Sequence, residues 1–186
     1  MHKKLMIFIP GVARQCDDPG YEVIRLLADQ KGCDLVCFHG PFKTGGGWRF
    51  YNRLKEALPQ NAEFQKSMPL LFAQIEKEVQ NRRLTFSDVL FCGHSQGGFL
   101  ALYLALKLGA AGGISLCGYW PAELTVNPKW YTQMDLVWVE GGLDTYFEPA
   151  AKHSYQILQR AGCRIRHVVN AKTTHEILDK SILDDV

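Results

Sequence analysis

Six short apolar runs recur along the chain, each bounded by polar residues, glycine or proline. Continuous apolar runs of this length are typical of strands buried on both faces of a parallel sheet. The last run alternates apolar and polar residues, as an edge strand does. The runs predict strands at residues 5–9, 34–38, 88–92, 113–117, 136–139 and 164–169.

Segments with the helical spacing of apolar residues lie between most of these strands. They predict helices at residues 19–32, 52–81, 99–108, 149–162 and 177–183. Pro59 and Pro69 are expected to interrupt the second of these helices, with Ser67 as the N-cap of its last part. We expect the apolar face of that part to carry Leu70, Leu71, Ile75 and Val79.

The alternation of strands and helices predicts an α/β fold in a single domain over residues 1–186. A strand, a helix and a second strand in succession form a right-handed parallel crossover. The helix at residues 99–108 is apolar on all sides, so we expect it to be covered by the rest of the domain. No repeat, linker or low-complexity segment divides the chain.

The composition excludes several classes of protein. With 47% hydrophobic and 22% charged residues the chain is globular rather than disordered. The net charge is only +2, which gives nucleic-acid binding no electrostatic support. The histidines do not cluster and no Cys-x-x-Cys occurs, so no metal is expected. No run approaches the roughly 20 apolar residues that cross a bilayer, so we expect a cytoplasmic protein without stable membrane insertion.

The chain has six cysteines, which in principle could form three disulfides. Five of them lie in or beside apolar, strand-like runs, where a thiol behaves as a small buried hydrophobe. We therefore expect buried free thiols at Cys33, Cys37, Cys92, Cys117 and Cys163.

The segment Gly93-His94-Ser95-Gln96-Gly97 has the pattern G-x-S-x-G. A predicted strand precedes it and a predicted helix follows it, which is the context of a nucleophile elbow. The two glycines leave room for a turn so tight that a side chain would collide with the neighbouring strand or helix. The sequence therefore predicts that Ser95 is presented as a nucleophile.

A serine hydroxyl needs a base to take its proton and an acid to orient that base. In a parallel sheet such residues gather after the carboxyl ends of strands. Asp144 follows the fifth strand, whereas Asp135 lies at the wrong end of that strand and Glu148 is expected only to cap a helix. His175 follows the sixth strand. The order Ser95, Asp144, His175 is the one expected of an elbow of this type.

An acyl-transfer site also needs backbone N–H donors for the oxyanion. Gln96 directly follows the nucleophile at a helix N-terminus, and the loop after the first strand supplies the second donor, for which we choose Val12. Arg14 in the same loop has two interpretations, as a ligand of a substrate carboxylate or phosphate and as a surface ion pair.

Residues 39–51 form a loop rich in glycine and aromatic residues after the second strand. A phosphate-binding loop is excluded because neither of the glycine fingerprints for phosphates is present. Aromatic side chains beside a strand end favour the wall of an apolar pocket, so Trp48 is a candidate substrate-binding residue, with Tyr119 and Trp120 after the fourth strand.

Taken together, these segments resemble the phospholipase/carboxylesterase group of α/β-hydrolases, which includes acyl-protein thioesterases. The matching residues are Gly93-His94-Ser95-Gln96-Gly97-Gly98, Leu116-Cys117-Gly118-Tyr119-Trp120-Pro121, Gly141-Gly142-Leu143-Asp144 with Pro149, and Thr174-His175-Glu176; the segment from Gly46 to Tyr51 is also similar. The resemblance implies an ester or thioester hydrolase that uses Ser95, His175 and Asp144 without a metal or organic cofactor.

Two departures from that group affect the expectation. The group usually has His-Gly after the first strand, where this chain has Pro10-Gly11, so the oxyanion donor on that side is open. The chain also lacks the preceding hairpin, so we expect a compact six-stranded sheet with strand order 2-1-3-4-5-6. No large lid is expected after the fourth strand, which favours an open pocket and small or soluble acyl substrates.

Other functions stay open at this point. The same three residues also serve amidases, peptidases and carbon–carbon hydrolases. A binding module that kept the elbow and lost the chemistry is a further alternative. The natural substrate and the oligomeric state do not follow from the sequence.

Overall fold

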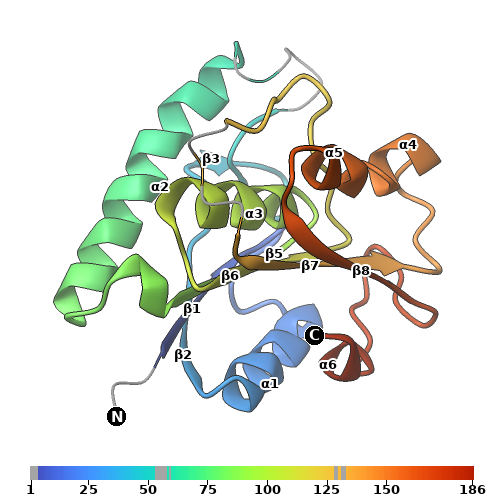
Figure 1. The fold of residues 1–186 in the computed structure, drawn as a ribbon, viewed down its shortest axis with the longest axis horizontal. Coiled ribbons are helices and arrows are strands. Elements are labelled where there is room, and N and C mark those ends of the chain that lie inside the picture. The colour runs from blue at the N-terminus through green and yellow to red at the C-terminus, as the bar shows by residue number, and fades with distance from the viewer. Residues whose placement is uncertain (1–3, 53–57, 59, 128–129, 131–132) are drawn as a thin grey trace.

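A computed structural model of the chain describes residues 4–52, 58, 60–127, 130 and 133–186. Its centre is a six-stranded parallel sheet with the order β2-β1-β5-β6-β7-β8 (Figure 1). Counted along the chain, this is the predicted order 2-1-3-4-5-6, and the predicted α/β-hydrolase fold is confirmed. The strands are β1 (Lys4–Ile9), β2 (Cys33–Cys37), β5 (Val89–His94), β6 (Gly112–Leu116), β7 (Asp135–Gly141) and β8 (Arg164–Asn170).

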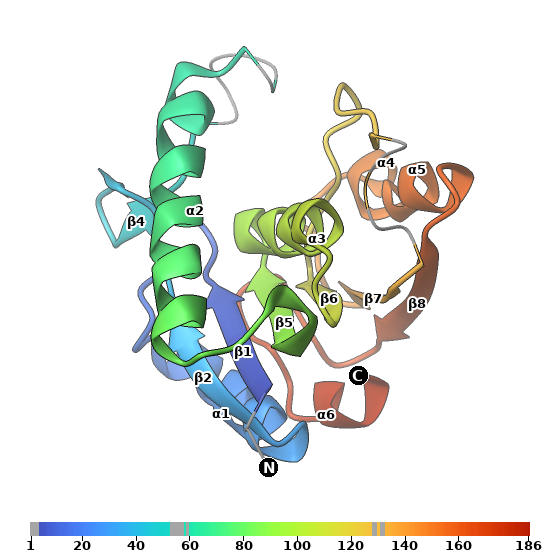
Figure 2. The same cartoon turned by 60° about the vertical axis from the view of Figure 1, so that its left-hand side comes forward.

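Helices cover both faces of this sheet (Figure 1, Figure 2). One face carries α1 (Glu22–Gln30), which follows a 3-10 turn at Pro19–Tyr21, and α6 (Ile182–Asp185). The other carries α2 (Ala62–Asn81), α3 (Gln96–Leu108), α4 (Pro149–Lys152) and α5 (Tyr155–Arg160). A second 3-10 turn, Phe86–Asp88, leads into β5.

Strand β1 shows why the apolar runs are continuous. Leu5, Ile7 and Ile9 belong to the hydrophobic cluster beneath α2 and α3, whereas Met6 and Phe8 belong to the cluster beneath α1. Both faces of the strand are therefore buried, as in other parallel sheets. Helix α3 is buried from its first residue to Leu106, which confirms that it is covered on all sides.

The prediction for α2 is wrong in its details. Asn61 is the N-cap, because its side chain accepts a hydrogen bond from the N–H of Phe64. Ser67 and Pro69 lie inside the helix, although a proline there costs about 3 kcal/mol. The buried face of the helix consists of Phe64, Ser67, Met68, Leu71, Ile75 and Val79. The free energy gained by burying these side chains outweighs the cost of the proline. Leu70 points away from this face and is half exposed.

Three other predicted segments also differ. The expected loop at residues 39–51 contains a small hairpin of β3 (Phe42–Lys43) and β4 (Trp48–Arg49). The predicted helix at 149–162 is two helices, and the final helix begins at Ile182 rather than near residue 177. Residues 53–57 and 59, which include Pro59, lie outside the described part of the chain.

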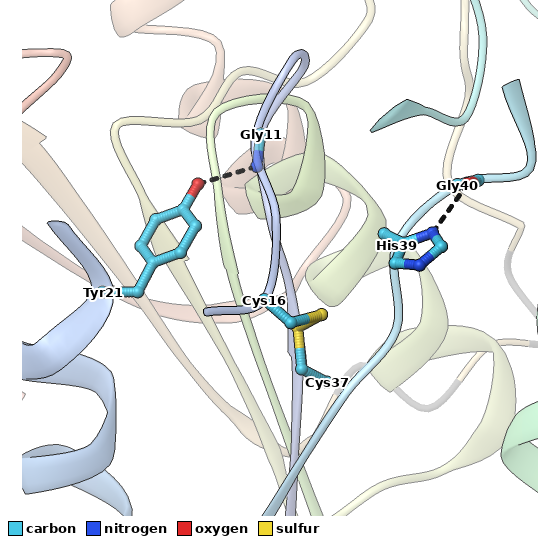
Figure 3. The surroundings of a disulfide bond; sticks show 6 residues. All are labelled: Gly11, Cys16, Tyr21, Cys37, His39 and Gly40. Atoms are coloured by element: carbon cyan, nitrogen blue, oxygen red, sulfur yellow. Dashed lines mark hydrogen bonds between the residues drawn. A yellow bond between two sulfur atoms is a disulfide. The ribbon is translucent and has the colours of Figure 1, made fainter. Parts of the chain in front are cut away.

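A disulfide joins Cys16 and Cys37, which corrects the prediction of a free thiol at Cys37 (Figure 3). The two cysteines are 21 residues apart in sequence, but β1 and β2 are parallel neighbours and their carboxyl ends lie together. The bond ties the loop after β1 to the end of β2. Cys33, Cys92, Cys117 and Cys163 are buried free thiols, as expected.

The described residues contain no helix that is both long and apolar enough to cross a bilayer.

Gly97 is expected to be essential for folding, because α3 and β1 approach each other closely there. A Cβ atom at this position would lie 1.9 Å from the carbonyl oxygen of Ile9, and the backbone cannot yield as a side chain would. We expect Gly97→Ala to lower the free energy of unfolding by about 3 kcal/mol or more. Gly45→Ala is the matched control, since a Cβ there meets nothing within 4 Å. Urea unfolding of both variants checks this, and equal midpoints would contradict it.

Candidate active site

Ser95 lies at the turn between β5 and α3 in a strained backbone conformation, with φ 54° and ψ −118°. A non-glycine residue with positive φ is uncommon and costs conformational energy. The turn is held because the N–H of Ser95 donates to the carbonyl of Leu116 on the adjacent strand at 2.9 Å. Gly93 permits the turn, since a Cβ there would lie 2.0 Å from the carbonyl oxygen of Gly97.

The three side chains that the sequence singled out lie in one hydrogen-bonded row. The Nε2 atom of His175 is 3.0 Å from Oγ of Ser95, and its Nδ1 atom is 2.8 Å from Oδ2 of Asp144. A carboxylate only accepts hydrogen bonds, so Nδ1 carries the proton in the neutral ring. Nε2 is then the acceptor that faces the serine hydroxyl. All three residues are buried.

The carboxylate of Asp144 is oriented from both sides. Its Oδ1 atom accepts a hydrogen bond from the backbone N–H of Tyr146 at 2.8 Å, while Oδ2 faces His175. The loop after β7 is itself bonded to the loop that carries His175, because the N–H of Leu143 donates to the carbonyl of Thr173 at 3.1 Å. The two loops thus hold acid and base in register.

Two aromatic rings that the sequence did not single out cover His175. The Tyr146 ring stacks on the imidazole, with 4.3 Å between centroids and an interplanar angle of 17°. Phe147 contacts it edge-on at 5.0 Å. They are the second and third residues after Asp144, so an aromatic pair close behind the candidate acid is the signal that could have found them. Their contacts limit the orientations that the imidazole can adopt.

The loop after β1 offers the backbone N–H of Val12 to a ligand in the pocket. Gly11 donates its N–H to the hydroxyl of Tyr21 at 3.0 Å, and Ala13 donates its N–H to the carbonyl of Trp48 at 3.0 Å. Among the described residues, the N–H of Val12 between them has no acceptor. Gln96 is the first residue of α3, so its N–H has no acceptor within the helix.

A pocket of about 410 Å³ opens beside Ser95 and is lined by both Val12 and Gln96. Tyr119, a candidate substrate-binding residue, also lines it, and the hydroxyl groups of Tyr119 and Tyr51 are hydrogen-bonded to each other. Tyr51, Phe147 and Tyr146 add further aromatic surface to the wall. The pocket is thus a small cavity with Ser95 in its wall, lined by aromatic rings together with polar and charged residues.

Trp48 and Trp120 do not line this pocket; Trp120 lines a second pocket that also includes Tyr51 and Tyr119, and a substrate-binding role for either tryptophan stays a prediction. Trp48 stacks on His39 at a centroid distance of 4.7 Å, on the hairpin beyond the pocket. Trp120 is buried and its indole N–H donates to the carbonyl of Leu124 at 2.8 Å. Adjacency in sequence to residues of the site therefore does not bring either ring into the pocket beside Ser95.

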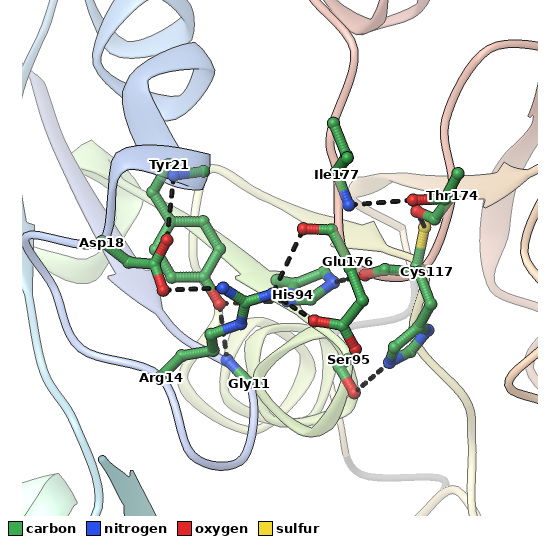
Figure 4. A network of polar contacts seen from close by, with 12 residues as sticks. Gly11, Arg14, Asp18, Tyr21, His94, Ser95, Cys117, Thr174, Glu176 and Ile177 are labelled. Atoms are coloured by element: carbon green, nitrogen blue, oxygen red, sulfur yellow. Dashed lines mark hydrogen bonds and ion pairs between the residues drawn. The ribbon is translucent and has the colours of Figure 1, made fainter. Parts of the chain in front are cut away.

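Charged residues at the edge of the pocket are paired with one another. Arg14 forms ion pairs with Asp18 and Glu176, which favours the ion-pair interpretation of this arginine (Figure 4). Arg49 forms a two-pronged pair with Glu63, at 2.9 and 3.1 Å. The positive charge of each guanidinium group is therefore already balanced by a carboxylate within the protein.

His94, directly before the serine, is buried beneath the site (Figure 4). Burial, followed by the neighbouring His175, lowers its pKa to about 3. The imidazole is therefore neutral when the protein is folded near neutral pH.

This shift predicts acid destabilisation. The unfolded chain takes up a proton at His94 near pH 6.5 and the folded chain does not, so the free energy of unfolding should decrease as the pH falls from about 6.5 toward 3. The slope from this residue approaches about 1.4 kcal/mol per pH unit. Urea titrations across that range should show a shallower slope for His94→Gln, which cannot take up the proton. Parallel slopes for the two proteins would contradict the assignment.

Comparison with known proteins gives a consistent picture. The family described as phospholipase/carboxylesterase matches residues 1–184. Esterase PE8 has a similar structure, with a TM-score of 0.79 and 21% identity over 98% of this chain and 89% of that one. SOBER1 of Arabidopsis thaliana is also similar, with a TM-score of 0.74 and 17% sequence identity over 98% of this chain and 94% of that one. A phospholipase/carboxylesterase of Dyadobacter fermentans has a TM-score of 0.70 and 19% sequence identity over 97% of this chain and 86% of that one. No curated protein sequence matches the chain.

Proposed function

Because the chain belongs to the phospholipase/carboxylesterase family and is an esterase-type hydrolase, we propose that it cleaves carboxylic esters or thioesters of small or soluble acyl substrates through an acyl-enzyme on Ser95. The observation that carries this proposal is the row from Ser95 through His175 to Asp144, with contacts of 3.0 and 2.8 Å. A serine with a base in reach, and a base with an acid in reach, is the arrangement that activates a hydroxyl for acyl transfer.

In the first half of the reaction, Oγ of Ser95 forms a bond to the substrate carbonyl while Nε2 of His175 takes the hydroxyl proton. The imidazolium that forms is stabilised by Asp144. The bond to the alcohol or thiol then breaks, and the leaving group takes the proton from His175. In the second half, water attacks the acyl-serine, His175 accepts its proton and returns it to Oγ, and the carboxylic acid leaves. The cycle needs no metal or organic cofactor.

The negative charge on the carbonyl oxygen is stabilised by the backbone N–H groups of Val12 and Gln96. Both residues line the pocket beside Ser95, and the N–H groups on either side of Val12 are already used within the protein. The N–H of Gln96 also lies at the positive end of the α3 dipole. One such donor contributes about 10²–10³ to kcat.

The side chain of Gln96 has a separate role in the wall of the pocket. Its Oε1 atom accepts the N–H of Phe50 at 2.8 Å, and its Nε2 atom donates to the carbonyl of Tyr51 at 2.9 Å. These bonds fix the segment that places the Tyr51 ring opposite Tyr119. A cavity of about 410 Å³ whose wall combines four aromatic rings with charged and polar residues suits a short acyl chain better than a long lipid tail.

The test is hydrolysis of p-nitrophenyl esters from acetyl to decanoyl, beside matching thioesters and an anilide. We expect turnover of esters, with kcat/KM highest for the shorter chains, and covalent labelling of Ser95 by a fluorophosphonate. Preference for the anilide would favour an amidase instead. Labelling without turnover would indicate a narrow substrate range, and absence of both would refute the proposal in favour of an inert binding module.

A further inference from the structure

A continuous chain of hydrogen bonds runs beneath the candidate active site, through two residues that the proposed mechanism does not use. The hydroxyl of Tyr21 is 3.0 Å from the backbone N of Gly11 and 3.0 Å from Nδ1 of His94. On the other side of the ring, Nε2 of His94 is 2.8 Å from the carbonyl oxygen of His175. Tyr21 and His94 are 5% and 2% exposed, so water does not compete for these bonds.

The direction of every bond in this chain is determined by chemistry. A carbonyl oxygen only accepts, so Nε2 of His94 must carry the proton that faces His175. In a neutral imidazole Nδ1 is then an acceptor, and it must receive the hydroxyl proton of Tyr21. The phenol oxygen in turn accepts the N–H of Gly11. All donors point the same way, from the loop after β1 to the loop after β8.

These hydrogen bonds connect the three segments whose relative positions determine the geometry of acyl transfer. Gly11 directly precedes Val12, the proposed oxyanion donor. His94 directly precedes Ser95 in the elbow. The carbonyl at the far end belongs to His175, the proposed base. One imidazole, with one phenol, therefore holds donor, nucleophile and base relative to each other (Figure 4).

We infer that His94 and Tyr21 are positioning residues for the hydrolytic reaction. This inference rests on the proposed function. Neither side chain is hydrogen-bonded to the reacting groups of Ser95, His175 or Asp144, although His94 lines the pocket; both act through the backbone of Gly11 and His175. The commitment of the Gly11 N–H to Tyr21 also assigns the oxyanion position to the next N–H along, that of Val12. Loss of these hydrogen bonds should slightly displace the oxyanion donor, the nucleophile and the base, and small displacements of reacting groups reduce kcat strongly.

Three variants separate the links. Tyr21→Phe removes the hydroxyl but keeps a ring that can pack edge-on against Phe8, as Tyr21 does at 4.7 Å. His94→Asn keeps a polar group near the position of Nδ1 and loses the link to His175. His94→Gln keeps an amide near the position of Nε2, which can still donate to His175. Tyr103→Phe is the matched control, because this buried tyrosine donates no bond to the site and contacts Lys107 on α3.

With p-nitrophenyl acetate, measured well below the melting temperature, we expect Tyr21→Phe to lower kcat about tenfold with KM within about twofold. His94→Gln should retain a higher kcat than His94→Asn, and Tyr103→Phe should match wild type. A purely structural role would lower the melting temperature of these variants without this kcat pattern. Wild-type kcat in Tyr21→Phe, or equal kcat in the two His94 variants, would overturn the inference.

A second readout does not depend on activity. In ¹⁵N NMR spectra near neutral pH, His94 should be a neutral ring protonated at Nε2, and Tyr21→Phe should shift its Nδ1 resonance. A ring protonated at Nδ1 would refute the chain of bonds even if the enzyme is active. If wild type hydrolyses no ester while the expected tautomer is observed, the proposed function fails and the role of these residues in hydrolysis fails with it.

Discussion

Ser95→Ala is expected to lower kcat for p-nitrophenyl acetate by about 10⁶-fold, the loss typical of removing a serine nucleophile. The acyl-enzyme cannot form without Oγ, and no other hydroxyl lies within hydrogen-bond distance of Nε2 of His175 among the described residues. Alanine accepts the strained backbone of the elbow as well as serine does, since both have a Cβ. The free energy of unfolding should therefore change by only about 1 kcal/mol.

The measurement is a steady-state assay beside fluorophosphonate labelling and thermal unfolding. Ser67→Ala is the matched control, because Ser67 is also fully buried but donates its hydroxyl to the carbonyl of Phe64 within α2. We expect this control to keep wild-type kcat. Turnover in Ser95→Ala within tenfold of wild type, in a folded protein, would exclude the covalent mechanism. An unfolded Ser95→Ala would instead show that the serine is needed for the fold.

Asp144→Asn is expected to lower kcat by about 10⁴-fold with little change in KM. The backbone N–H of Tyr146 determines how the amide sits, because it needs an acceptor and keeps the asparagine oxygen on its side. The NH₂ group then faces Nδ1 of His175 and forces that atom to accept. Nε2 carries the proton in that tautomer, so it cannot take the proton of Ser95.

Asp135→Asn is the control for this variant, since Asp135 begins β7, the strand that precedes Asp144, and lies in an exposed pair with Arg164. It should leave both kcat and KM unchanged. The ¹⁵N spectrum of Asp144→Asn should show His175 protonated at Nε2 instead of Nδ1. An active Asp144→Asn with the wild-type tautomer would remove Asp144 from the mechanism and return the other carboxylates near the site to consideration.

Local patterns in the sequence were sufficient for the strands of the sheet and for the choice of Ser95, Asp144 and His175. The strands are buried on both faces and are therefore visible in the sequence as continuous apolar runs, and their order in the sheet was predicted from the resemblance to the phospholipase/carboxylesterase group. The glycines around Ser95 are needed because a side chain at either position would collide with nearby backbone, and this requirement is visible in the local sequence pattern. Because functional residues gather at the carboxyl ends of parallel strands, Asp144 and His175 could be chosen from their place after β7 and β8.

Features that depend on contacts between distant segments required the tertiary structure. Pro69 lies inside α2 because burial of one face outweighs a local penalty that the sequence makes conspicuous. The partner of Cys37 is decided by which strand ends meet, and the pocket by which way the side chains of Trp48 and Trp120 point. Tyr21 and His94 are 73 residues apart in sequence, and no periodicity links them. The sequence by itself determined the elements and the chemistry available at each strand end; only the folded chain decided which groups share hydrogen bonds, because such bonds act over a few ångströms and join residues that are far apart along the chain.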